Sequence, residues 1–184
     1  MRTNYLILIF IAFMTLTAGA QKFITKTGHI KLFSEAPLEK IEAHNRQVNS
    51  ILDGATGNFV FKVLLKSFEF EKALMQEHFN ENYVESDKYP NSTFLGKVTN
   101  IKDVNFGQDG SYDVVVEGKL TLHGVTNTEK AKGTFEVKQG KVSGKAIFNL
   151  TLADYKITIP GAVGNNISKT VEITVDVTLD KANL

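Results

Sequence analysis

The chain has 184 residues, a length usual for one domain, and its 21 basic and 20 acidic side chains leave a net charge of +1. This balance predicts neither a nucleic acid nor an anionic membrane surface as a partner. The sequence contains no cysteine, which excludes disulfides, thiol catalysis, cysteine-ligated zinc and a lipid anchor on an N-terminal cysteine.

Residues 1–20 have the pattern of a secretory signal peptide. Arg2 supplies a positive charge, an apolar run extends from Leu6 to Leu16, and Ala18-Gly19-Ala20 forms a cleavage site of small residues. The run is too short for a membrane span, so cleavage is favoured over retention as a membrane anchor. We therefore expect an exported chain, residues 21–184, without stable membrane insertion. Because Arg2 is the one charged residue removed, the mature chain would carry 20 basic and 20 acidic side chains and no net charge.

From Gln21 onward, apolar and polar residues mostly alternate, which is typical of strands with one apolar and one solvated face. Weaker strands are expected around Ile30 and Leu32, around Phe135 and Val137, and over residues 92–106, where a phase slip near Asn100 suggests a bulge. Residues 37–53 fit neither the strand nor the helix period. The clearest apolar rows are Phe59, Phe61, Val63 and Leu65; Val114, Val116, Leu120 and Leu122; Ala146, Phe148, Leu150 and Leu152; and Val171, Ile173, Val175, Val177 and Leu179.

Residues 70–84 have the spacing of an amphipathic helix. The side chains expected on one side of it are Leu74, Met75, His78, Phe79 and Tyr83. Short turn sequences at Asp53-Gly54, residues 108–110 and Gln139-Gly140 predict hairpins between consecutive strands.

About eight strands, several of them eleven or more residues long, predict an all-β fold: an antiparallel, lipocalin-like barrel with one amphipathic helix. Alternation alone does not distinguish a packed interior from a hollow one. A hollow barrel lined in this way would offer neither charge nor hydrogen bonds, and would select a ligand by its length and apolarity. Burial contributes about 0.8 kcal/mol per CH₂, so a long acyl or isoprenoid chain would bind in such a barrel.

The sequence contains no recognisable catalytic constellation or cofactor motif, so we expect neither an enzyme nor a cofactor-dependent protein. The four histidines, His29, His44, His78 and His123, lack metal-ligand spacing, so no metal site is expected. His123 ends a long strand on its polar face, before Gly124. It therefore either closes a hairpin with its ring outside or forms a structural hydrogen bond or gate at the barrel rim.

The segment "VEGKLTLHGVTNTEKAKGTFEV" resembles the G-x-L-T-L-H-G-V-T signature of the YceI-like polyisoprenoid-binding family. The resemblance extends over about residues 28–181, including Tyr89-Pro90 with Phe94 and the later "IFNLTLADYKITIP". It implies a lipocalin-like barrel over residues 21–184, a helix near one opening, and a long isoprenoid or acyl lipid in the bore. It also implies a bacterial protein of the periplasm or secreted, since members are typically exported, and some are linked to stress responses or isoprenoid quinones.

Strand phase and this resemblance together predict the ligand-binding residues. On the helix, Phe79 and Tyr83 are expected to cover the mouth. The expected lining residues are Phe59, Phe61, Val63, Val116, Leu120, Leu122, Phe148, Leu150, Val175 and Val177. Alternatives to a lipid carrier or reservoir are a packed, non-catalytic interaction or stress-related module and an outer-membrane barrel. A homodimer is also compatible with the sequence.

Overall fold

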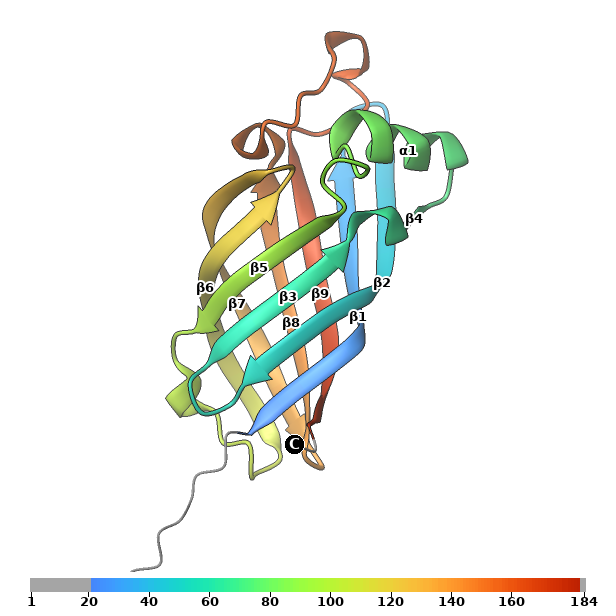
Figure 1. The fold of residues 1–184 in the computed structure, drawn as a ribbon. Coiled ribbons are helices and arrows are strands. Elements are labelled where there is room, and N and C mark those ends of the chain that lie inside the picture. Colours follow the sequence, from blue (N-terminus) through green and yellow to red (C-terminus); the bar gives the residue numbers. More distant parts are fainter. Residues whose placement is uncertain (1–20, 183–184) are drawn as a thin grey trace, which may run out of the picture.

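A computed structural model describes residues 21–182, and the predicted signal peptide lies outside the described residues. The fold is a closed antiparallel barrel of eight strands, which confirms the predicted fold class (Figure 1). Neighbouring strands follow the order β1-β9-β8-β7-β6-β5-β3-β2, and pairing of β1 with β2 closes the ring. The strands are β1 (Lys22–Glu35), β2 (Lys40–Asp53), β3 (Asn58–Leu64), β5 (Asn91–Val98), β6 (Gly110–Leu122), β7 (Val125–Lys138), β8 (Lys141–Thr151) and β9 (Thr170–Lys181).

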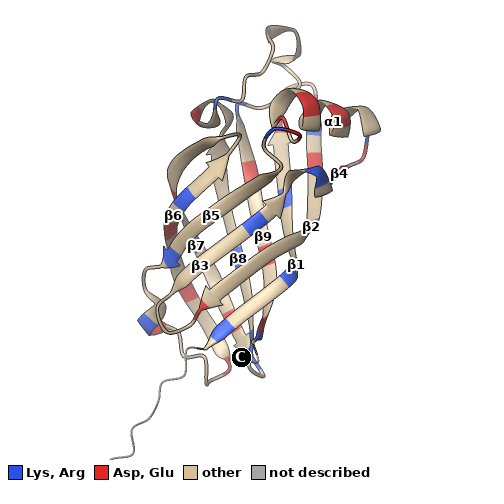
Figure 2. Ribbon diagram, in the orientation of Figure 1, with Lys and Arg blue, Asp and Glu red and all other residues tan. Residues whose placement is uncertain are grey.

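The predicted apolar rows face the barrel interior. Val114, Leu150 and Val177 are buried, whereas the intervening Glu117, Asn149 and Thr178 are exposed. Charged side chains of both signs occur along the strands and at both ends of the barrel (Figure 2). An outer-membrane barrel requires the opposite arrangement, with apolar residues outside and polar residues inside.

Residues 37–53, which the sequence left unassigned, contain the whole of β2. The buried positions change parity within this strand, from Ala43 and Asn45 to Val48 and Ser50. The change occurs at Asn45, whose side-chain oxygen accepts from the Gln47 backbone N–H at 2.9 Å and whose amide donates to the Leu64 carbonyl at 2.8 Å. The register between β1 and β2 shifts near the same place, so a bulge interrupts the two-residue period that would have identified the strand.

The prediction of one bulged strand over residues 92–106 is wrong. Strand β5 ends at Val98, and a 3₁₀ turn, η3 (Ile101–Asp103), leads the chain away from the sheet. The Asn100 side chain fixes this departure, since its oxygen accepts from the Val115 N–H and its amide donates to the Asp113 carbonyl, both at 2.9 Å. Gln108 and Asp109 therefore end a longer connection to β6, which begins at Gly110. The hairpins predicted after Asp53 and at Gln139-Gly140 are present.

The helical region is shorter than predicted. A short strand, β4 (Phe68–Phe70), pairs with β2 beside the ring, and α1 (Ala73–His78) follows and continues into a π-helical turn, η2 (Phe79–Tyr83). Leu74 is exposed rather than part of the predicted apolar face, whereas Phe79 packs on the rings of Phe68 and Phe70 and Tyr83 packs, partly buried, on the same cluster. Within residues 21–182, no helix is long and apolar enough to cross a membrane.

Candidate functional site

The two ends of the barrel differ in how completely they are filled. At the end that holds the C-terminus, opposite α1 in Figure 1, the rings of Phe23, Phe59 and Phe135 pack with Ile101 and Val104 into a dense cluster. Toward the end that carries α1, several inward-facing side chains remain partly accessible to solvent. They are Leu32, Phe61, Leu120, Leu122, Phe148, Ile173 and Val175. An apolar side chain that points inward and is still accessible indicates a hollow interior.

A cavity of about 180 Å³ occupies this part of the barrel. Its wall is almost entirely apolar and comes from seven of the eight barrel strands, all except β2, together with Phe68, Phe79, Val84, Leu152 and Ile157 near the α1 end. The structure places every residue of the predicted lining in this wall, and Phe79 as well. Tyr83 does not line the cavity but packs, partly buried, against the surrounding cluster, where burial raises its pKa. That the predicted lining residues, Phe79 and Tyr83 contact a ligand stays a prediction.

Small residues on β7 and β8 form one side of the cavity. Ala131, Gly133, Gly144 and Ala146 all line the cavity, and Gly133 is the register partner of Ala146. A Cβ atom at Gly133 would lie 2.5 Å from the Lys145 carbonyl oxygen, so the close approach of β7 and β8 requires glycine there. The Phe135 ring lies over Gly144 and belongs to the cluster that fills the end of the barrel opposite α1.

One carboxylate lies in the apolar wall, contrary to the expectation of an uncharged lining. Glu129 occupies an inward-facing position of β7 and lines the cavity. Its Oε1 accepts a hydrogen bond of 2.6 Å from the hydroxyl of Tyr155, a fully buried residue of the 3₁₀ turn η4 (Leu152–Tyr155). Burial, followed by this hydrogen bond, raises the pKa of Tyr155. The sequence contains a signal for this carboxylate. Glu129 shares the inward-facing side of β7 with residues 127 and 131, so a charged residue falls where an apolar one is expected.

His123 both closes the hairpin and forms a structural hydrogen bond at the rim. It joins β6 to β7 with Gly124, and the positive φ angles of these residues, 51° and 72°, suit a tight two-residue turn. The prediction that its ring lies outside is wrong, because the side chain is only 14% exposed. Its Nδ1 lies 3.0 Å from the Tyr155 carbonyl oxygen and its Nε2 lies 2.7 Å from Glu85 Oε2.

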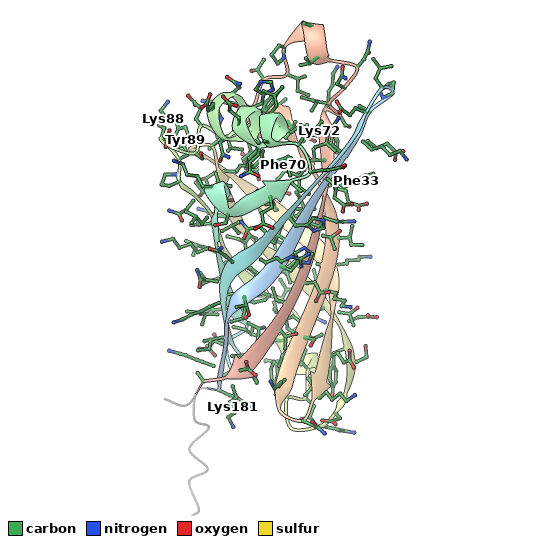
Figure 3. The ribbon with its side chains drawn as sticks, turned by 90° about the vertical axis from the view of Figure 1, so that its right-hand side faces the viewer. Phe33, Phe70, Lys72, Lys88, Tyr89 and Lys181 are labelled. Atoms are coloured by element: carbon green, nitrogen blue, oxygen red, sulfur yellow. The ribbon has the colours of Figure 1, made fainter. Side chains whose placement is uncertain are left out.

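Other contacts hold the segments around the α1 end of the barrel. Figure 3 shows Phe70, Lys72, Lys88 and Tyr89 at this end and Lys181 at the other. The Lys72 ammonium donates to Glu39 at 2.8 Å, and the Asn166 amide donates to the same carboxylate at 3.4 Å. These two bonds lower the pKa of Glu39 and link the β1–β2 turn to the start of α1 and to the loop before β9.

The remaining histidine contact lies on the outer wall. His29 Nε2 is 2.9 Å from His44 Nδ1, and His44 Nε2 is 2.8 Å from Glu42 Oε1. Burial and the nearby positive charge of Arg46 lower the pKa of His29. In residues 21–182, no group of three or more histidine, aspartate or glutamate side chains is arranged to hold a metal ion.

Comparison with protein families gives one match, to the YceI-like domain, over residues 14–179. No curated protein matches the sequence.

Solved structures share the fold at low identity. A polyisoprenoid-binding domain from Saccharophagus degradans, implicated in plant cell wall breakdown, superposes with a TM-score of 0.76 at 14% identity, covering 89% of this chain and 99% of that one. For BcnA of Burkholderia cenocepacia the TM-score is 0.66 at 14% identity, with 83% and 95% of the chains covered. For the YceI protein of Campylobacter jejuni it is 0.58 at 15% identity, with 77% and 85% covered.

Proposed function

This chain belongs to the YceI-like family, and we propose that it is an exported, soluble carrier or reservoir for a lipid with one long apolar chain, held inside the barrel. The lipid would be a polyisoprenoid, an isoprenoid quinone or a fatty-acid-like molecule. The observation that carries the proposal is the apolar cavity, into which several inward-facing side chains remain partly accessible.

The dimensions of the cavity support an apolar guest. Its volume of about 180 Å³ exceeds the roughly 150 Å³ of an engineered apolar cavity that stays dry and binds benzene. A longer chain would need additional space, which partly exposed rings such as Phe61, Phe94 and Phe148 would provide by changing rotamer. Each further CH₂ buried contributes about 0.8 kcal/mol, enough to offset the ordering of a few side chains.

The cavity also favours a carrier over a packed interaction module, the principal alternative. A module whose barrel serves only as a scaffold gains stability from a filled interior, because each inward-facing gap forfeits packing energy. Here Ala131 and Ala146 present only a methyl group each to the interior, and the cavity beside them stays open.

Extraction of co-purified lipid tests the proposal. The full chain would be expressed in a bacterium, purified without detergent and extracted with organic solvent, and the extract would be examined by mass spectrometry. We expect a long-chain lipid at up to one molecule per protein. An extract that repeatedly matches a mock purification, from protein that also fails to take up a fluorescent acyl or prenyl probe, would refute the carrier proposal.

Export to the periplasm or the medium belongs to the same proposal, and the segment of residues 1–20 described above supports it. N-terminal sequencing of the exported protein should begin at Gln21. Recovery of a chain that starts at Met1 and stays with the membrane fraction would contradict cleavage.

Self-association into a homodimer is supported by a row of apolar side chains on the outer wall. Ile24, Ile51, Val60 and Leu95 are exposed, and each is the register partner of the next across β1, β2, β3 and β5. Light scattering should give the mass of two chains, and Val60→Lys should give that of one. A monomer at high micromolar concentration would exclude the dimer.

A further inference from the structure

The cavity wall has one ionisable side chain that faces the bore, that of Glu129. Lys145 also contributes to the wall, but its ammonium lies 3.6 Å from Asp176 and its side chain is 71% exposed, so it points away from the bore. Ser92, the other polar residue of the wall, donates its hydroxyl hydrogen to the Thr121 carbonyl at 3.0 Å. Glu129 is therefore the group of the cavity wall with which the polar end of a bound lipid would interact.

One of the two oxygens of the Glu129 carboxylate already accepts a hydrogen bond. Its Oε1 accepts from the Tyr155 hydroxyl at 2.6 Å, and the Tyr155 carbonyl in turn contacts His123 Nδ1 at 3.0 Å. These contacts connect the carboxylate to the rim and fix its position. Among residues 21–182, no lysine, arginine or histidine nitrogen forms an ion pair with Glu129 within 4 Å.

Within the described part of the chain, the one hydrogen bond recorded for this carboxylate is on Oε1, so Oε2 keeps its acceptor capacity on a side chain that lines an apolar cavity. A guest that covered the oxygen without donating a hydrogen bond would remove its water and leave a charged acceptor unpaired, which is unfavourable. A guest with an anionic end would in addition bring a like charge beside it.

We infer that the lipid ends in a hydrogen-bond donor, an alcohol or a protonated amine, which binds Glu129, and that lipids ending in a carboxylate or phosphate are disfavoured. The inference rests on the proposed function. The apolar chain would then extend along β7 past Ala131 and Gly133 toward Phe135. Phe135 lies six positions after Glu129 on β7, about 20 Å away at the rise of an antiparallel strand.

A set of lipids with one chain and different ends tests the inference. Hexadecanol, hexadecylamine and hexadecanoate would be titrated into delipidated protein at pH 7, each below its critical aggregation concentration, with displacement of a fluorescent acyl probe as the readout. We expect the alcohol and the amine to bind about tenfold or more tightly than the carboxylate, the effect of one charge-assisted hydrogen bond. The wild-type ranking alone tests the inference, whether or not any variant folds.

Glu129→Gln removes the charge and keeps the shape of the side chain. It should weaken the amine and strengthen hexadecanoate, so that the difference between them narrows about tenfold. Glu136→Gln is the matched control, because Glu136 lies on the same strand but is exposed on the outer wall, and it should leave the ranking unchanged.

The outcomes separate this inference from the proposed function. If none of the three lipids displaces the probe, lipid binding itself fails. If all three bind with equal affinity, or if hexadecanoate binds best in the wild type, a lipid carrier remains and the donor end group is refuted. A ranking that Glu129→Gln leaves unchanged while the variant stays folded also refutes the role of Glu129.

Discussion

Filling the cavity with a side chain of the protein itself should abolish lipid binding while preserving the barrel. Ala146 is suited to this substitution, because it lines the cavity and its register partner on β7, Gly133, has no side chain to obstruct a ring. Ala146→Phe adds one phenyl ring to a space of about 180 Å³. Since a cavity of roughly 150 Å³ accommodates benzene, that ring would occupy most of the space.

The loss of affinity follows from the chain length that the ring displaces. A six-carbon ring excludes about six methylene groups, and at about 0.8 kcal/mol each this removes about 5 kcal/mol, or roughly three orders of magnitude in Kd. The ring also strains the barrel, at a typical cost of about 1–3 kcal/mol in the free energy of unfolding. The variant should therefore remain folded, with a lower melting temperature.

Fluorescence titration with an acyl probe measures the affinity, and circular dichroism confirms the fold. Ile147→Phe is the matched control, since Ile147 is the adjacent residue of β8 and is 61% exposed on the outer wall. The control should bind like the wild type. If Ala146→Phe stays folded and binds the probe with unchanged affinity, the reasoning that places the lipid chain in the cavity beside Ala146 is refuted.

Three further predictions concern the rim and the outer wall. Tyr155→Phe removes the buried hydroxyl that donates to Glu129 and should lower the free energy of unfolding by about 1–2 kcal/mol in urea titrations; an unchanged midpoint would show that the bond contributes nothing. His123→Asn keeps a residue that suits the positive φ of the hairpin but loses the contact with Glu85, so we expect destabilisation by about 1 kcal/mol. Stability equal to or above wild type would mean that turn geometry alone matters at this position. Because the folded-state pKa of His29 is lowered, the unfolded chain binds its proton more readily, and stability should fall as pH drops below about 6.5. The melting temperature of His29→Gln should decline less between pH 7 and pH 5 than that of the wild type, and equal declines would contradict this.

The inner and outer faces of most strands were predictable from the sequence, because side chains alternate strictly along an unbroken strand. Phe148 and Leu150 are examples on β8. Where a bulge interrupts the period, as at Asn45, the alternation no longer identifies the strand. A side-chain contact also diverts the chain at Asn100, which nothing in the spacing indicates.

The hollow interior and its one carboxylate were not predictable from spacing. Whether the interior stays open beside β7 and β8 depends on which residues pair across the two strands, and at this point the pair is Gly133 and Ala146. The Glu129–Tyr155 bond joins residues 26 positions apart on different elements. The phase of β6 predicts an outward ring for His123, yet a residue in a tight turn no longer follows the phase of the strand that it ends.

The position of a lipid chain inside the barrel can be measured directly by NMR. Contacts between the methylene protons of ¹³C-labelled hexadecanol and the protein would be recorded as isotope-filtered NOEs. We predict NOEs to Phe148, Ile173 and Val175, whose side chains line the cavity. NOEs confined to Ile147 and Leu95, which are exposed on the outer wall, would contradict a lipid held inside the barrel.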